Sequence, residues 1–353
     1  MVTIVIIAAV IALAFNFMNG MNDAANAIAT VVATKALSPK GAVWWAGFWI
    51  FAACLTFFFI EPSVARTMGK GIVQEVCIDP YVILAALIGS VIWIWFCTHL
   101  GLPISASHAL IGGLIGPVWF VYGGNYLIGS GIGQILLFII LSPLIGLVLG
   151  FVMHCFFLWV FKSTKAHPAP TERVFRRLQL FSSAIFSFSF GLNDGQKTMG
   201  VIAILLASAL SQAPDNAFLQ TVYNVSDGQF VPYWLMFVSY GLISMGTIIG
   251  GWKVIKTLGS GLAKITPLTG FCSELSGSLT LITTAFLGIP VSTTHTVTGA
   301  IIGTGLTRGV KSVKWMTAKN IMWAWVITIP ATIIVSGLIY LLLVALGAPV
   351  KAL

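Results

Sequence analysis

The sequence predicts an all-α polytopic membrane protein made of two inverted-topology repeats, each with a broken helix and a re-entrant hairpin. Of its 353 residues, 58% are hydrophobic and 8% are charged, whereas a soluble domain has roughly 25% charged residues. The 82 residues from Pro80 to Phe161 contain no Asp, Glu, Lys or Arg, and about 20 apolar residues suffice for one membrane span. This composition excludes a water-soluble enzyme and a nucleic-acid-binding protein.

Two motifs occur twice, which indicates an internal duplication. Residues 101–116, GLPISASHALIGGLIG, align with residues 288–303, GIPVSTTHTVTGAIIG, with seven of sixteen positions identical. NFMNGMND at 16–23 likewise resembles SFSFGLND at 187–194, and the two pairs keep the same order with offsets of 187 and 171 residues. We therefore predict a first repeat at 1–161, a cytoplasmic connecting loop at 162–177 and a second repeat at 178–353.

The basic residues set the expected orientation of the second repeat. Although the net charge is +9, the Lys and Arg residues lie between apolar segments, as the positive-inside rule requires. The connecting loop has five basic residues and one Glu, so we place it in the cytoplasm. Segment 178–213 then crosses outward and 233–252 returns. The apolar arms 265–287 and 290–307 begin and end inside, which is typical of a re-entrant hairpin.

The same count applied backwards orients the first repeat. Segment 41–60 is expected to span the membrane, and the arms 80–100 and 104–121 form a hairpin that enters from outside. Both termini are expected outside the cytoplasm, in a multi-pass protein of the cell (inner) membrane. The apolar N-terminal segment has no basic n-region and is expected to be a transmembrane element. Hairpins entering from opposite faces are typical of secondary transporters.

The first segment of each repeat is too long for a simple span. Residues 2–34 would extend about 50 Å as one helix, against about 30 Å of hydrocarbon, and segment 178–213 is equally long. We expect both to be broken or tilted at their polar motifs, because polar backbone is tolerated at membrane depth where it lines a site.

Asp23 and Asp194 are carboxylates at equivalent positions of the two repeats. Each costs at least about 2.5 kcal/mol near the middle of a membrane, so their duplication indicates a shared purpose. Neighbouring Asn and Asp oxygens suit Na⁺, whereas a lone Asp can carry a proton. The structural alternative is a polar pair that pins two helices together.

The two hairpin tips, Pro103 to His108 and Pro290 to His295, predict an anion site. Each proline begins a helix, and the Ser and Thr residues after it lie beside free N–H groups at the positive helix end. Two such tips meeting at the midplane can enclose a tetrahedral oxyanion. Lys197, which replaces Asn26 of the first repeat, adds a cation beside the anion or simply neutralises Asp194.

Three further ionisable residues are assigned supporting or gating roles. His108 and His295 follow the hydroxyls at equal spacing and support the tips through hydrogen bonds, with proton handling as the alternative. Glu274 has no acidic counterpart, since it aligns with Leu87, and can be a cation ligand, a gate or the partner of a basic residue. The five cysteines lack metal-ligand spacing.

These motifs resemble the inorganic phosphate transporter (PiT) family over nearly the whole chain. The resemblance lies in NGMNDAANAIATVVATKALSP at 19–39, RLQLFSSAIFSFSFGLNDGQKTMGVIA at 177–203 and the two PxSxxH tips. It implies two inverted repeats, extracellular termini, cation-coupled uptake of phosphate, and a homo-oligomer, with a dimer favoured. The implied phosphate-binding residues are Ser105, Ser107, Ser292, Thr293, Thr294, Gln196 and Lys197. The implied Na⁺ ligands are Asn22, Asp23, Asn26, Asn193 and Asp194.

Two departures from the family pattern bear on the coupling ion. Many bacterial members have GFHD where this chain has Gly20 to Asp23, and AHG where it has Ser189 to Gly191. Both differences remove a histidine, the side chain best suited to carry protons near neutral pH, and therefore favour Na⁺ over H⁺. The Asn-Asp pairs favour phosphate, because a sulfate-transporting branch of the family lacks them.

The sequence therefore predicts a secondary active transporter, not an enzyme, that imports inorganic phosphate with sodium by alternating access around a midplane site. It needs no cofactor besides Na⁺ as the coupling ion, and its partners are phosphate, Na⁺ and the lipid bilayer. The alternatives are a proton-coupled phosphate symporter and a sulfate permease of the same family. A passive anion channel is disfavoured because no ring of basic residues is evident, and an intramembrane enzyme because no nucleophile or metal motif is.

Overall fold

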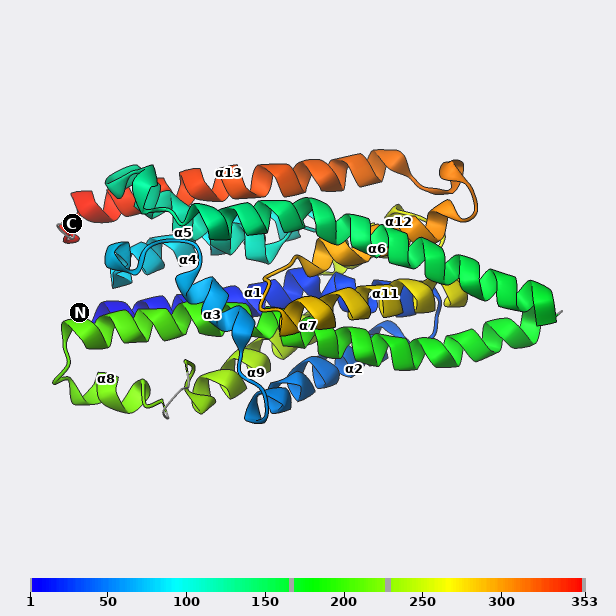
Figure 1. The fold of residues 1–353 in the computed structure, drawn as a ribbon, viewed down its shortest axis with the longest axis horizontal. Helices are drawn as coiled ribbons and strands as arrows, with labels where there is room; N and C mark the ends of the chain where they lie inside the picture. Colours follow the sequence, from blue (N-terminus) through cyan, green and yellow to red (C-terminus); the bar gives the residue numbers. More distant parts are fainter. Residues whose placement is uncertain (1, 165–167, 226–229, 351–353) are drawn as a thin grey trace.

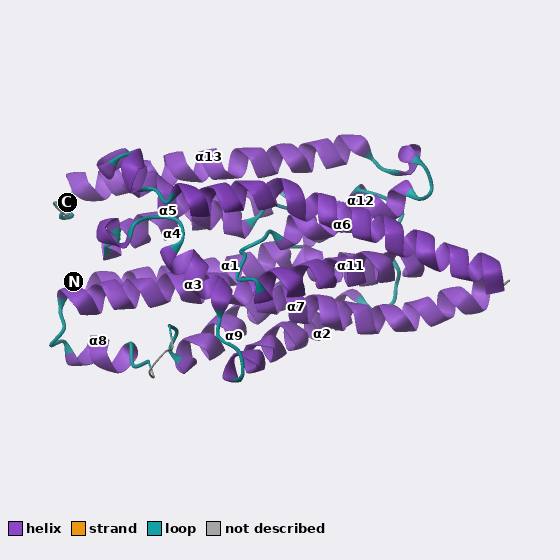
Figure 2. Cartoon of the chain, in the orientation of Figure 1, coloured by secondary structure: helices purple, strands orange, loops and turns teal. Residues whose placement is uncertain are grey.

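The computed structural model describes residues 2–164, 168–225 and 230–350, and within these ranges every named element is helical (Figures 1 and 2). The elements of the first half are α1 (Val2–Ala33), α2 (Pro39–Ala52), α3 (Ser63–Lys70), α4 (Pro80–Leu100), α5 (Ala106–Tyr122) and α6 (Gly129–Thr164). Those of the second half are α7 (Pro168–Gln212), α8 (Ala217–Val222), α9 (Tyr233–Ile249), α10 (Trp252–Gly261), α11 (Pro267–Phe286), α12 (Thr293–Leu306) and α13 (Trp315–Ala345). Short 3₁₀ segments join some of them.

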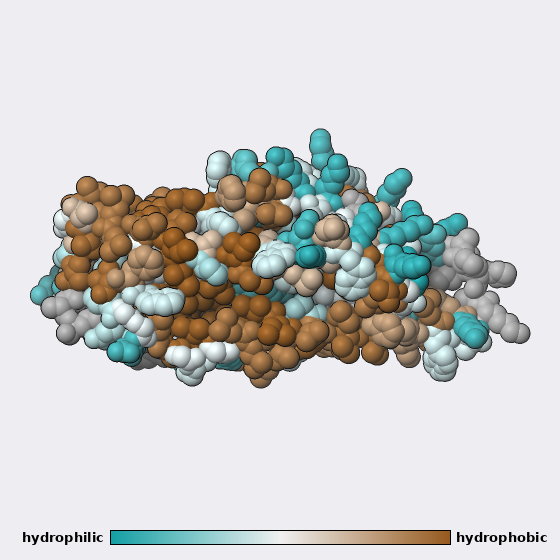
Figure 3. Space-filling model, turned by 90° about the horizontal axis from the view of Figure 1, so that it is seen from above, coloured by the Kyte–Doolittle hydropathy of each residue, from teal (hydrophilic) through white to brown (hydrophobic). Residues whose placement is uncertain are grey.

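The helices are long and apolar, as a polytopic membrane protein requires. In the described part of the chain, five helices can cross a membrane by length and composition, or six if the bent pair α9–α10 forms one span. Apolar residues cover most of the face in Figure 3, and hydrophilic residues gather toward the end where α6 and α7 meet. The predicted all-α membrane fold is confirmed.

The motif helices are not broken, contrary to the prediction. α1 runs unbroken over 32 residues and α7 over 45. The motif side chains of α1 find partners on neighbouring elements: Asn16 donates to the Ser239 carbonyl and Asn22 to the Thr98 hydroxyl, so the backbone need not unwind. The sharp break lies between α9 and α10, which meet at 72°.

The predicted connecting loop 162–177 is mostly helical. α6 continues to Thr164 and α7 already begins at Pro168, and residues 165–167 lie outside the described ranges. The first turns of α7 are amphipathic: Phe175 is buried against Phe157 and Phe271, whereas Arg173 and Arg176 are exposed. The prediction of a loop considered only the charged residues of this segment, and it missed that Phe175 gives the segment a buried apolar side.

The two predicted hairpins are present, α4 with α5 and α11 with α12. Their first arms begin in the same way, because Asp79 and Thr266 cap α4 and α11 and a proline follows each cap. Their second arms pack closely on a neighbouring helix. A Cβ on Gly116 of α5 would lie 2.3 Å from a carbonyl oxygen of α13, and one on Gly303 of α12 2.1 Å from one of α6. Gly112 and Gly299, four residues earlier on the same helices, also lie close to carbonyl oxygens of α13 and α6, and small residues at i and i+4 are typical of membrane helix interfaces.

The halves exchange partners around their motif helices. α1 packs against α9 and α10 of the second half, and α7 packs against α2 and α3 of the first. The α4–α5 hairpin lies toward the end with both chain termini and the α11–α12 hairpin toward the other (Figure 1). This arrangement agrees with an internal duplication of inverted topology.

Candidate functional site

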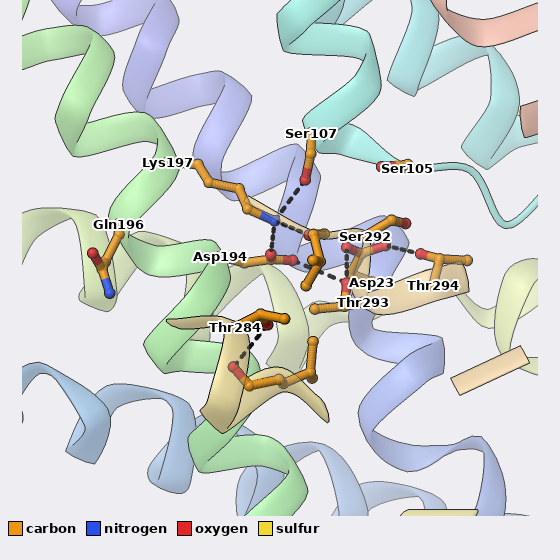
Figure 4. A network of polar contacts seen from close by, with 12 residues as sticks. Asp23, Ser105, Ser107, Asp194, Gln196, Lys197, Thr284, Ser292, Thr293 and Thr294 are labelled. Carbon is orange, nitrogen blue, oxygen red and sulfur yellow. Dashed lines mark hydrogen bonds and ion pairs between the residues drawn. The ribbon is translucent and has the colours of Figure 1, made fainter. Parts of the chain in front are cut away.

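The two hairpin tips meet between α1 and α7, the helices that carry the Asn-Asp motifs. The tips touch directly, because the Thr294 hydroxyl donates to the Ile104 carbonyl at 3.0 Å. Figure 4 shows side chains from α1, α5, α7 and α12 converging there. The sequence predicted this meeting of four distant segments.

Lys197 lies at the centre of the site on α7. Its ammonium donates to the Asp194 carboxylate, to the Ser107 hydroxyl at 2.6 Å and to the Val291 carbonyl at 2.7 Å (Figure 4). Lys197 and Asp194 are each 1% exposed. The lysine thus pairs with Asp194, which is one of the two predicted interpretations, and it also joins the two tips.

Asp23 on α1 holds the tip of the second hairpin. Its two carboxylate oxygens lie 3.1 Å from the Thr293 and Thr294 hydroxyls, and the Thr293 hydroxyl also lies 3.1 Å from Asp194. Asn26 donates to the Thr294 hydroxyl at 2.9 Å. We call the set Asp23, Asn26, Ser107, Asp194, Lys197, Thr293 and Thr294 the central cluster. These side chains are all less than 5% exposed, so the site is closed in this structure.

Ser105 and Ser292 are helix caps. Their hydroxyls accept from the backbone N–H groups of His108 and His295, at 3.3 and 3.2 Å. The first amides of α5 and α12, those of Ala106 and Thr293, have no intrahelical acceptor. They give the site two positive helix ends, to which an oxyanion is attracted.

Asn22 and Asn193 carry buried oxygens that have no hydrogen-bond partner among the described residues. Asn22 donates through Nδ2 to Thr98 at 2.8 Å, but its Oδ1 has no hydrogen-bond partner. Asn193 has none at either side-chain polar atom. A buried polar group without a partner is costly, so the two equivalent oxygens are free for a cation.

Gln196 faces away from the central cluster. Its Oε1 accepts from the backbone N–H groups of Val64 and Ala65, at 2.9 and 3.3 Å, and its Nε2 donates to the Leu192 carbonyl (Figure 4). The side chain therefore caps the N-terminus of α3. In this closed structure it has no position from which to contact an anion held by Lys197.

His108 and His295 lie side by side in the first turns of α5 and α12. Their ring centres are 4.7 Å apart, and His295 also stacks on Trp325 at 3.7 Å. His295 Nδ1 lies 3.3 Å from the Ile139 carbonyl, and Trp325 donates to the Pro103 carbonyl. His295 thus links the second hairpin to α6 and α13, whereas His108 contributes a ring contact and its Nδ1 has no hydrogen-bond partner among the described residues. Support through an imidazole hydrogen bond is therefore seen for His295, and for His108 it stays a prediction.

Glu274 lies in a separate polar cluster, of which α1, α7 and α11 each contribute a part. Its carboxylate accepts from Thr30 at 2.5 Å, from Gln179 at 3.1 Å and from Ser182. Its partners are hydroxyls and an amide, so of the three predicted roles the pairing with a basic residue does not fit these contacts.

Sequence reasoning missed several polar neighbours. Thr98 contacts Asn22, and Thr30, Gln179 and Ser182 contact Glu274. For Thr30 a signal was available, since the polar residues of α1 recur every three or four positions from Asn16 to Thr34 and therefore share one helix face. The partners on other helices carried no such signal.

The chain is similar to known phosphate transporters over nearly its whole length. A family model described as "Phosphate transporter family" matches residues 19–336. The chain is 42% identical over 330 residues to a probable low-affinity inorganic phosphate transporter of Rhizobium meliloti (strain 1021), covering 94% of this chain and 93% of that one. It is 37% identical to a protein of the same description in Bacillus subtilis (strain 168), covering 96% of each.

A solved structure shares the fold over nearly the full length. The protein described as "The sodium-dependent phosphate transporter" superposes with a TM-score of 0.82 and 26% identity, covering 97% of this chain and 99% of that one. Helix content, site and relatives together identify a membrane-embedded transporter rather than an enzyme, and the chain belongs to the phosphate transporter family.

Proposed function

We propose that this protein carries inorganic phosphate across the membrane together with sodium ions, by alternating access to the central cluster. The observation that carries the proposal is the meeting of two helix N-termini at a buried Lys197 flanked by two carboxylates. No cofactor besides Na⁺ is needed in this mechanism.

The phosphate would lie between the two tips. The ammonium of Lys197, the Ser107, Thr293 and Thr294 hydroxyls and the first amides of α5 and α12 offer hydrogen-bond donors from two sides. Arrangements of this kind suit a tetrahedral oxyanion. In the closed structure the Lys197 ammonium and the Thr293 and Thr294 hydroxyls donate to protein acceptors, so phosphate would displace those bonds. Ser105 and Ser292 would act as caps that shape the tips.

The sodium ions would lie beside the two Asn-Asp pairs. The unpartnered oxygens of Asn22 and Asn193, together with the carboxylates of Asp23 and Asp194, are hard donors of the kind that Na⁺ prefers. The description of the structural neighbour as sodium-dependent supports the same ion. Asn26, which donates its amide to Thr294, keeps a carbonyl oxygen that can complete either site.

Charge balance would couple the two fluxes. Phosphate near neutral pH is largely divalent, and two carboxylates already surround the site, so its burial without cations leaves unpaired charge in a low dielectric, which is costly. Sodium ions beside Asp23 and Asp194 would offset that charge. Neither substrate then enters efficiently alone.

The experiment is uptake of radiolabelled phosphate into proteoliposomes with an inward Na⁺ gradient, compared with K⁺ and with a proton gradient. Asp23→Asn and Asp194→Asn should each abolish sodium-driven accumulation, whereas Asp215→Asn, an exposed carboxylate, should not. Equal uptake driven by protons would keep phosphate but reject sodium. Sulfate movement in place of phosphate would reject the substrate, and downhill flux without accumulation would indicate a channel.

A further inference from the structure

The short helix α3 is tied to the tip of the α11–α12 hairpin by one side chain. The Thr67 hydroxyl donates to the Gly288 carbonyl at 2.8 Å. Gly288 has a φ of +68°, and a Cβ there would lie 3.1 Å from the Ser63 side chain. The turn therefore presses closely on the first residue of α3, and only glycine fits it without strain.

The short helix α10 repeats this contact on the α4–α5 hairpin. The Thr257 hydroxyl lies 2.9 Å from the Gly101 carbonyl. Gly101 has a φ of +73°, and its Cβ would lie 3.1 Å from the Lys253 side chain. The local geometry is also the same in both helices. The Thr67 hydroxyl lies 3.3 Å from the Ser63 carbonyl oxygen, and the Thr257 hydroxyl lies 3.1 Å from the Lys253 carbonyl oxygen, in each case four residues earlier.

Each short helix is further held by the other half of the molecule. Gln196 of α7 caps α3, and a Cβ on Gly200 of α7 would lie 2.2 Å from the Ala65 carbonyl. Lys253 of α10 donates to the His99 carbonyl at 2.9 Å, and Gly251, which precedes α10, lies against the Met21 carbonyl of α1. α3 and α10 are thus held in place by contacts with the other half of the molecule, and each covers the tip of one hairpin.

The two covers lie on opposite sides of the central cluster. The hairpins come from opposite ends of the molecule and their tips meet in the middle (Figure 1). The α4–α5 hairpin comes from the end with the termini, and α10 lies beyond its tip. The α11–α12 hairpin comes from the other end, and α3 lies beyond its tip. Both threonine bonds are formed here, where the cluster is buried.

We propose that Thr67 and Thr257 are positioning residues that act as alternating latches, Thr67 closing the site from the side of α3 and Thr257 from the side of α10. This inference rests on the proposed alternating access. One latch opens at a time, because release of a hairpin tip from its cover exposes the cluster on that side only. A net hydrogen bond shifts a two-state equilibrium by roughly two- to tenfold, enough to bias the closed state and still allow it to open.

The test measures access to the site from each face. The five native cysteines are first replaced, and one reporter cysteine is then introduced. It is Val291→Cys in the hairpin tip that α3 contacts, or Ile104→Cys in the tip that α10 contacts; the two positions are equivalent and buried. A membrane-impermeant thiol reagent is then applied from either side of oriented vesicles. Thr67→Val should speed labelling of the first reporter about fivefold from the α3 side alone, and Thr257→Val that of the second from the α10 side alone.

Matched variants separate a latch from general loosening. Thr67→Ser and Thr257→Ser keep the hydroxyl and should restore slow labelling. Thr283→Val removes an exposed α11 hydroxyl that bonds only its own helix and should change nothing. Unchanged labelling, or labelling that rises equally from both faces in either latch variant, overturns the proposal. The readout needs no transport, so sided labelling by a protein that moves no phosphate would reject the proposed function and keep the latches.

Discussion

The ion pair of Lys197 and Asp194 is nearly free of solvent, with side chains 2% and 1% exposed. Breaking a buried pair by removing one partner leaves an uncompensated charge and typically costs about 3–5 kcal/mol, whereas removing both charges costs much less. Lys197→Met should therefore destabilise strongly and abolish phosphate uptake. Lys197→Met with Asp194→Asn should recover much of the stability without recovering uptake.

Thermal unfolding in detergent, followed for both variants, checks this prediction. Arg66→Met is the control, because Arg66 pairs with Glu61 at side-chain exposures of 54% and 48%, and exposed pairs contribute about 1 kcal/mol or less. A single Lys197→Met variant as stable as the wild type would contradict the central place of the ammonium.

Asn193 leads to a prediction of opposite sign for stability. Since neither of its side-chain polar atoms has a partner, Asn193→Ala should leave stability without sodium unchanged or slightly higher. A ligand that binds only the folded state raises the unfolding temperature. Sodium should therefore stabilise the wild type, and stabilise Asn193→Ala much less.

This prediction is checked by measuring the unfolding temperatures of both proteins over a sodium titration, with Asn125→Ala as an exposed control. An equal effect of sodium on the wild type and on Asn193→Ala would remove Asn193 from the ion site.

The candidate residues could be named from the sequence, but the partner toward which each side chain points could not. Carboxylates at membrane depth are costly, so Asp23 and Asp194 stood out, and the structure brings them together through Thr293. Gln196 differs because its partners are the amides of Val64 and Ala65, more than 130 residues earlier in the chain. Nothing near Gln196 in the sequence indicates α3.

At the scale of elements, the second arm of each hairpin depends on glycines. A Cβ on Gly303 would lie 2.1 Å from the Leu147 carbonyl, and a backbone oxygen cannot move aside without separating α12 from α6. Overpacking of this kind costs about 1–3 kcal/mol. Gly303→Ala should therefore lower the unfolding temperature.

A matched glycine distinguishes packing from helix propensity. A Cβ on Gly241 of α9 would meet nothing within 4 Å, so Gly241→Ala should be neutral or should stabilise by up to about 1 kcal/mol. Differential scanning fluorimetry of the two variants measures both effects. Equal losses would contradict the close helix contact.

Element positions followed from hydropathy, caps and prolines, whereas element continuity did not. Hydropathy alone gives the length of α1 but not the acceptors for the side-chain amides of Asn16 and Asn22, which lie on other helices and allow α1 to continue unbroken. The predicted span 233–252 agrees with α9 within three residues, since Gly250, with a φ of +71°, ends that helix. The sequence did not show that the basic segment after it is the further helix α10.

At the scale of the whole molecule, one end carries exposed basic residues. The exposed Arg173 and Arg176 lie at the end where α6 and α7 meet, opposite the termini (Figure 1). By the positive-inside rule that end should face the cytoplasm. In a cysteine-free variant, Asn125→Cys, in the loop after α5, should react with an impermeant reagent on intact cells. Ser163→Cys, near the end of α6, should react only after permeabilisation. The reverse pattern would invert the topology.

The exchange of partners between the halves has a consequence for synthesis. α1 is made first, yet Asn16 bonds to Ser239, and Asp23 to Thr293 and Thr294, which leave the ribosome more than 200 residues later. Until then, the nascent α1 presents an amide and a carboxylate that no completed neighbour satisfies. If α1 inserts into the membrane as it is made, it therefore waits for its packing partners during most of the translation of the chain. The growing chain then needs either the insertion machinery or the lipid–water interface to hold α1 until the second half arrives.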